Sequence, residues 1–252
     1  MHTVVETHEL AKTYGRFTAL RGLSIAVPEG AVFALIGASG SGKTTAIKLL
    51  LNLTHPTHGS AALFGVDSRA VGPAVLARIG YVSENQALPP RLRVDEFFDY
   101  LRACYPGWDR GLEDTLRTQL RLPPERKIGE LSHGMRLKMA LACALPFHPA
   151  LLILDEPFSG LDALAREEII NAFLQPARDL SILISSHELE EIERLATHLV
   201  FLHEGRMLFQ GSLTALREHA RAMFPALGLG DDAMSLRVIF VAMVRAAVQD
   251  RG

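Results

Sequence analysis

Cysteine, aromatic residues and long apolar runs are all scarce in this chain of 252 residues, and its charges nearly balance. The two cysteines, Cys104 and Cys143, stand in different segments without metal-ligand spacing, which indicates ordinary thiols in a reducing compartment. No apolar run approaches the roughly 20 residues that would span a bilayer. The formal net charge of −2 gives no electrostatic basis for binding nucleic acid.

The composition nevertheless suits a well-packed soluble protein. Hydrophobic residues make up 48% of the chain and charged residues 21%, which fits one large domain or one core with subdomains. The first ten residues, MHTVVETHEL, lack a basic run followed by an apolar stretch, so we expect no signal peptide. We expect a cytoplasmic protein, whose work at a membrane would need a spanning partner from another polypeptide.

Short apolar runs at residues 32–36, 151–154 and 182–184 alternate with loops and helical segments. Runs of this kind are typical of parallel strands buried on both faces, so we expect an α/β core. Residues 199–209 predict a hairpin with Gly205 in its turn. Between Pro89 and Pro149 the apolar spacing becomes helical, which predicts an inserted helical block over about residues 82–149.

A tail follows Gly211. We expect a break over residues 228–232 and then a helix capped by Ser235, with an apolar stripe along residues 236–247. Packing of this helix on its own domain or on a dimer partner is the favoured interpretation. A membrane-surface role is the alternative, which the small number of flanking cations disfavours.

The segment GASGSGKT fits the pattern Gly-x4-Gly-Lys-Thr, after an apolar strand and before a helix. Its glycines let backbone N–H groups converge on phosphate oxygens, and the helix adds its positive N-terminal end. Lys43 can reach the β- and γ-phosphates, and the Thr44 hydroxyl can bind Mg²⁺. The predicted nucleotide-binding residues are Gly37, Ala38, Ser39, Gly40, Ser41, Gly42, Lys43, Thr44 and Thr45.

Further motifs follow downstream: LSHGM at 131–135, LLILDEP at 151–157, FSGLD at 158–162 and ISSHE at 184–188. Asp155 ends a buried apolar run, where a carboxylate can hold Mg²⁺, and the adjacent Glu156 can polarise a water. His187 follows another apolar run, where its ring N–H could contact a γ-phosphate. Ser132 and Gly134 give a hydroxyl and a bare backbone to the start of a helix.

Taken together, these motifs, in their order and spacing over about residues 4–220, resemble the ATP-binding subunits of ABC transporters. The resemblance implies a P-loop NTPase (RecA-like) α/β core, an antiparallel β subdomain and an inserted α-helical subdomain. It implies a domain of residues 1–211 that contains the helical subdomain at 82–149, and a helical tail of residues 212–252. The implied ligands are ATP and Mg²⁺.

The same resemblance assigns roles to single residues. Glu156 takes the place of the catalytic base, His187 that of a γ-phosphate sensor, and Lys43 acts with them. Tyr14, in KTYGRFTAL, takes the place of the ring that stacks on adenine. Asp162 belongs to the segment that resembles the family's D-loop.

The segment LSHGM stands in place of the family's signature, which is usually LSGGQ. In the family, this helix start contacts ATP held by a partner subunit, so that two chains enclose two nucleotides head to tail. Ser132 and Gly134 keep the phosphate-contacting parts, whereas His133 and Met135 depart from the usual residues. The implied partner is a second copy or a related ATPase subunit.

Glu84, in GYVSEN, stands where the family usually has the Q-loop glutamine. A carboxylate there can still bind Mg²⁺, directly or through water. Two alternatives stay open: its negative charge slows the chemistry, or it is only a solvated loop acid.

Glu84, the signature, YPGWD at 105–109 and the tail SLRVIFVAMV together resemble one branch of the family. It comprises single-cassette bacterial subunits that pair with a separate ABC-2 type permease, often exporters linked to bacitracin-type resistance. The expected protein is an ATPase on the inner face of the cell membrane, with no nucleic-acid partner. A soluble ABC-type ATPase that acts as a regulator or sensor is the alternative function.

Overall fold

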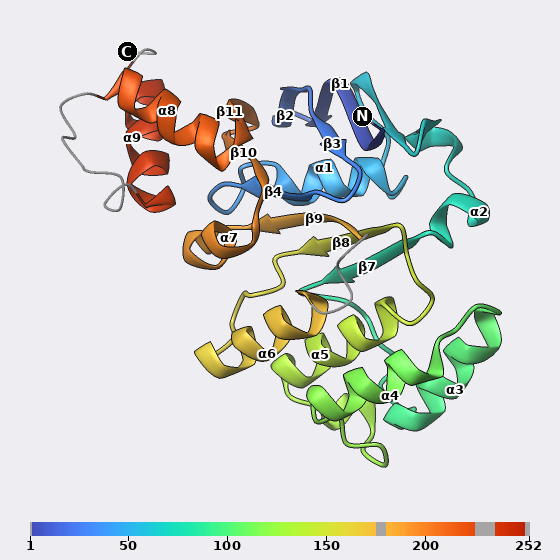
Figure 1. Cartoon of the computed structure of the whole chain (residues 1–252). Coiled ribbons are helices and arrows are strands. Elements are labelled where there is room, and N and C mark those ends of the chain that lie inside the picture. The colour runs from blue at the N-terminus through green and yellow to red at the C-terminus, as the bar shows by residue number, and fades with distance from the viewer. Residues whose placement is uncertain (1, 175–179, 225–234, 250–252) are drawn as a thin grey trace.

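The computed structural model describes residues 2–174, 180–224 and 235–249 and contains two sheets with helices around them (Figure 1). Its elements, in chain order, are β1 (Thr3–Tyr14), β2 (Phe17–Leu23), β3 (Ala26–Pro28), β4 (Val32–Ile36), α1 (Lys43–Leu50), β5 (His58–Leu63), β6 (Val66–Asp67), η1 (Ser68–Ala70), α2 (Pro73–Leu76), β7 (Ile79–Ser83), α3 (Val94–Cys104), α4 (Arg110–Gln119), η2 (Ile128–Glu130), α5 (His133–Ala144), β8 (Leu151–Asp155), α6 (Ala163–Leu174), β9 (Ser181–Ser186), α7 (Leu189–Leu195), β10 (His198–His203), β11 (Arg206–Ser212), α8 (Leu213–Met223) and α9 (Leu236–Gln249).

The larger sheet has the strand order β11-β10-β4-β9-β8-β7, and all its pairs are parallel except β10–β11. Its central strands are buried on both faces, as their largely apolar sequences predict. In β4, Phe33 and Leu35 pack into the core on one side of the sheet, while Ala34 and Ile36 pack into the core on the other side. The predicted parallel strands and the hairpin with Gly205 in its turn are therefore confirmed.

The smaller sheet is antiparallel, with the order β2-β1-β5-β6 and with β3 paired to β1. Helix α1 packs against β1, β2 and β5 of this sheet and against β8 of the larger one. Its apolar side, with Ile47 and Leu50, is buried in the core shared by the two sheets. The phosphate-loop helix is thus anchored on both sides.

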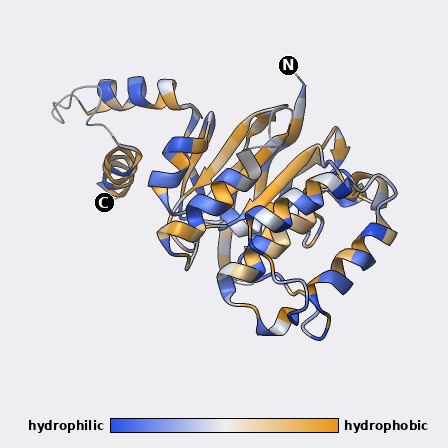
Figure 2. Cartoon of the chain, turned by 60° about the horizontal axis from the view of Figure 1, so that its bottom comes forward, coloured by the Kyte–Doolittle hydropathy of each residue, from blue (hydrophilic) through white to orange (hydrophobic). Residues whose placement is uncertain are grey.

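Helices α3, α4 and α5 fill the chain between β7 and β8 and lie with α6 on the opposite face of the larger sheet (Figure 1). The outer helices carry alternating apolar and polar residues, while the central strands are apolar along their length (Figure 2). Glu113 on α4 is buried, and its carboxylate accepts hydrogen bonds from Arg102, Arg117 and the Trp108 indole. Both cysteines are free, and burial raises the pKa of the Cys143 thiol, which keeps it protonated.

The C-terminal helix α9 packs on α7 and β11. It buries Leu236, Ile239 and Met243, and the ring of Phe240 meets Phe201 of β10 edge to face. The prediction that this helix packs on its own domain is confirmed. The predicted break over residues 228–232 lies outside the described residues. Within the described part of the chain, no helix is long and apolar enough to cross a membrane.

Candidate functional site

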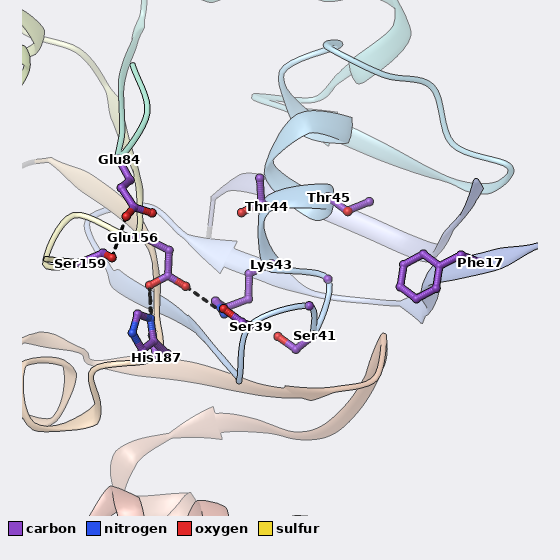
Figure 3. Close-up of a pocket in the computed structure, with 12 residues that line it drawn as sticks. Phe17, Ser39, Ser41, Lys43, Thr44, Thr45, Glu84, Glu156, Ser159 and His187 are labelled. Carbon is purple, nitrogen blue, oxygen red and sulfur yellow. Dashed lines mark hydrogen bonds and ion pairs between the residues drawn. The ribbon is translucent and has the colours of Figure 1, made fainter. Parts of the chain in front are cut away.

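The carboxyl ends of four neighbouring strands form one site. The phosphate loop follows β4, His187 follows β9, Asp155 ends β8 with Glu156 directly after it, and Glu84 follows β7. Because these strands are parallel and adjacent, their ends meet at one edge of the sheet. A cavity of about 460 Å³ opens there (Figure 3). The predicted residues that line it are Ser39, Gly40, Ser41, Gly42, Lys43, Thr44, Thr45, Glu84, Glu156 and His187.

The phosphate loop owes its shape to its glycines. Gly42 has a φ of 108°, and a Cβ there would lie 2.6 Å from the Ala19 carbonyl oxygen. The loop therefore lies close against the β1–β2 region. Gly37 and Ala38 do not line the cavity, but their carbonyls accept hydrogen bonds from Lys43 Nζ at 2.6 and 3.1 Å. The ammonium group is thereby held at the base of the loop.

Glu156 lies between the two other residues predicted to act in catalysis. Its Oε1 is 2.9 Å from Lys43 Nζ, and its Oε2 is 2.7 Å from His187 Nδ1 (Figure 3). Its φ of 54° is uncommon for a residue with a side chain, and such backbone conformations cluster at functional sites. The carboxylate balances the charge of Lys43, which is only 4% exposed. A γ-phosphate would compete with Glu156 for that ammonium group.

Oxygen ligands gather beside the phosphate loop. Asp155 Oδ1 accepts hydrogen bonds from Thr44 Oγ1 at 3.1 Å and from Ser185 Oγ at 2.6 Å. Thr44, Glu84 and Asp155 line a second cavity of about 270 Å³, together with Tyr81, whose pKa is raised by burial. A hydroxyl beside a buried carboxylate fits Mg²⁺. Within the described chain, no group of three His, Cys, Asp or Glu side chains could hold a metal ion.

Sequence reasoning missed Ser185, whose hydroxyl is hydrogen-bonded to both Asp155 and Glu156. Besides its bond to Asp155, its Oγ accepts a hydrogen bond from the Glu156 backbone N–H at 3.0 Å. The hydroxyl lies in the fully buried strand β9, next to β8. The polar serines in ISSHE, at the end of an otherwise apolar run, were the available signal.

Tyr14, whose ring is predicted to stack on adenine, does not line the cavity, whereas Phe17 does. The two residues are direct partners across the β1–β2 hairpin, so their rings lie on the same face. Tyr14 is 45% exposed, and Lys12 Nζ lies 5.0 Å from the centre of its ring. Phe17 is 61% exposed and faces the cavity opening, which makes it a second candidate for base stacking.

Ser132, Gly134 and Asp162 lie outside this cavity. Ser132 caps α5 by accepting a hydrogen bond from the Met135 N–H, which confirms the predicted helix start. Asp162 Oδ1 accepts a hydrogen bond from the Ala165 N–H at 2.8 Å, at the start of α6. The predicted phosphate contacts thus fall into two separate groups.

Glu84 lies against the site. Its carboxylate lines both cavities, and Oε1 accepts a hydrogen bond from Ser159 Oγ at 2.8 Å. Its backbone N–H donates to the Asp155 carbonyl at 3.1 Å. These contacts disfavour the interpretation as a solvated loop acid. Ser159, which sequence reasoning also missed, lines the main cavity.

The phosphate loop follows β4 of a largely parallel sheet, and the acidic residues Asp155 and Glu156 stand at the carboxyl end of β8, two strands away. This arrangement defines a P-loop NTPase, as predicted. The family model described as ABC transporter matches residues 20–159. A relative, "Bacitracin transport ATP-binding protein BcrA" of Enterococcus faecalis, is 33% identical over 225 residues, which covers 88% of this chain and 73% of the relative.

Solved structures of ABC transporter proteins have a similar fold. One described as the structure of an ATP-binding subunit of an ABC transporter has a TM-score of 0.83 and 28% identity, covering 96% of this chain and all of that one. A bacterial Atm1-family ABC exporter with ATP bound has a TM-score of 0.75 and 26% identity, covering 92% of this chain and 43% of that one. The chain therefore belongs to the ABC transporter family. It is an ATP-binding subunit, an ATPase that couples hydrolysis to transport.

Proposed function

We propose that Lys43, Glu156 and His187 act together on the γ-phosphate of ATP. Lys43 neutralises charge on the β- and γ-phosphates, Glu156 accepts the proton of the attacking water, and the His187 ring donates a hydrogen bond to the γ-phosphate. The observation that carries this proposal is the chain of contacts from Lys43 through Glu156 to His187 across one cavity.

Thr44 and Asp155 would hold Mg²⁺, with Glu84 as a further ligand, directly or through water. The ion supplies neutralisation of phosphate charge when bound. The support for this assignment is that the three side chains present oxygen atoms to one cavity. Tyr14 and Phe17 would both contact the base, from neighbouring positions on one hairpin.

The site is completed by a second ATPase chain, either another copy or a related subunit. Ser132 and Gly134 present a hydroxyl and a bare backbone at the start of α5, outside this chain's own cavity. Such a helix start favours an anion, and the phosphates bound by the partner are the proposed ligand. Asp162 lies on the same interface. ATP would then join two chains, and hydrolysis would release them.

This opening and closing drives a separate membrane permease of the ABC-2 type, and the subunit works on the inner face of the cell membrane. The similarity to a bacitracin transport protein and to an exporter supports an export role. The proposed division is an ATP-binding domain of residues 1–211, with a helical subdomain at 82–149, and a tail of residues 212–252. Helices α3, α4 and α5 between β7 and β8 support the inserted subdomain.

Glu156→Gln tests the catalytic assignment. We expect ATP hydrolysis by the purified chain to fall at least about 100-fold, because an amide cannot act as the base. Binding of a fluorescent ATP analogue should persist. Glu167→Gln, which changes an exposed carboxylate paired with Arg194, is the matched control and should hydrolyse normally. Normal hydrolysis by Glu156→Gln would refute the assignment.

Affinity capture of the tagged chain from solubilised membranes tests the partner. A transporter subunit should bring a multi-span membrane protein with it. Capture of soluble proteins alone would favour the regulator or sensor instead.

A further inference from the structure

Glu84 and His133, two positions at which the chain departs from the family's usual motifs, contact the same residue, Ser159. The Ser159 hydroxyl donates to Glu84 Oε1 at 2.8 Å, and Figure 3 shows the two side chains pointing toward each other. On its other side, the Ser159 carbonyl oxygen lies 3.2 Å from His133 Nε2. Because a carbonyl only accepts hydrogen bonds, the histidine ring is the donor.

The surroundings of Ser159 hold it firmly. Its backbone N–H donates to the Glu156 carbonyl at 3.3 Å, which closes a turn directly after the proposed base. Phe158 before it is fully buried, and Leu161 after it is 8% exposed. Ser159 is itself half-buried, so its turn is anchored by the buried side chains of Phe158 and Leu161.

We propose that Ser159 is a positioning residue that couples Glu84 to the N-terminal turn of α5. The inference rests on the proposed function, in which Glu84 faces Mg²⁺ and the phosphates, and Ser132 and Gly134 serve the partner's nucleotide. A change in the position of the Glu84 carboxylate would alter its bond to the Ser159 hydroxyl, and the Ser159 carbonyl would carry that change to His133.

Removal of the hydroxyl tests the link. Ser159→Ala keeps the carbonyl that binds His133 but loses the bond to Glu84. Because a hydrogen bond to a charged group is lost, we expect kcat to fall about tenfold, while KM for ATP stays within about twofold. Ser159→Thr restores a hydroxyl and should recover most of the loss. The matched control is Ser24→Ala, whose hydroxyl also donates to a glutamate, Glu9, at 3.1 Å, away from the site.

Coupling is measured by combining variants. Glu84→Ala and His133→Ala each break the same link, so together they should lower kcat by less than the product of their separate effects. In the Ser159→Ala background the link is already broken, and the two effects should multiply. Multiplication in both backgrounds would overturn the proposal, as would an unchanged kcat for Ser159→Ala or no recovery in Ser159→Thr.

Binding of a fluorescent ATP analogue separates this inference from the proposed function. Wild type, Ser159→Ala and Ser159→Thr should bind the analogue with similar affinity. A wild-type chain that binds no nucleotide would overturn the proposed function and this inference with it. Normal binding with no coupling would overturn the inference alone.

Discussion

The start of α1 and the start of α5 present the same chemistry in different settings. Each offers backbone N–H groups, a glycine and a hydroxyl to an anion. At α1 these groups line a cavity around the buried Lys43. At α5 Ser132 is exposed and caps its own helix, outside that cavity. The proposed function accounts for this difference: the chain would build one half of an ATP site internally and offer the other half to a second chain.

Among changes at the two helix starts, we expect the largest effect from a change to the internal half, at α1. Lys43→Met keeps the length of the side chain but removes its charge, so nucleotide phosphates lose a charge-assisted hydrogen bond. We expect nucleotide affinity to fall by about 10- to 100-fold. Titration with a fluorescent ATP analogue measures the change, and Lys127→Met, on an exposed lysine, is the control. Equal affinities of Lys43→Met and wild type would place the nucleotide elsewhere.

Ser132→Asp changes the other half of the site, the start of α5 that is offered to the second chain. Aspartate retains the helix cap but places a negative charge against the partner's phosphates. We expect hydrolysis to fall about tenfold with analogue binding to the single chain unchanged. Ser212→Ala removes the comparable cap of α8, where Ser212 Oγ accepts from the Ala215 N–H at 3.1 Å, and should hydrolyse normally. If Ser132→Asp weakens binding to the isolated chain, the two halves lie in one site.

The rings of Phe17 and Tyr14 should contribute differently to binding of the adenine base. Since an aromatic ring stacked on a base contributes about 1 kcal/mol or more, Phe17→Ala should weaken binding of ATP about fivefold. Tyr14→Ala should have the smaller effect, because Tyr14 does not line the cavity. Measurement of ATP against free triphosphate isolates the contribution of the base. The reverse order would support the sequence-based assignment to Tyr14.

The smallest effect is expected at the junction of the two halves. Glu84→Gln keeps an acceptor for the Ser159 hydroxyl and an oxygen for Mg²⁺, so ATPase activity should stay within about threefold of wild type. Steady-state hydrolysis at several Mg²⁺ concentrations measures this. Complete loss of activity would show that the carboxylate itself is required.

Local pattern was enough to predict the elements that hold the site. Residues 32–36 and 151–154 are too uniformly apolar for exposed strands, and the structure buries both runs in the parallel sheet. Ser132 has the side chain of a helix cap, and α5 begins directly after it. The order of the motifs then predicted the family that the comparisons show.

Contacts between distant segments could not be predicted in the same way. Ser159 bonds Glu84 across 75 residues, and Ser185 bonds Asp155 across 30. Short polar side chains of this kind have no periodicity, and their partners are set by how strands and loops meet in space. The position of Phe17 depends on the register of the β1–β2 hairpin, which places it opposite Tyr14.

We propose that ATP is enclosed between two chains. Light scattering of Glu156→Gln at increasing protein concentration, with and without Mg²⁺-ATP, tests it most directly. We predict the mass of one chain without nucleotide and the mass of two chains with it. A single-chain mass at saturating ATP, together with wild-type hydrolysis per chain that does not depend on concentration, would contradict the claim.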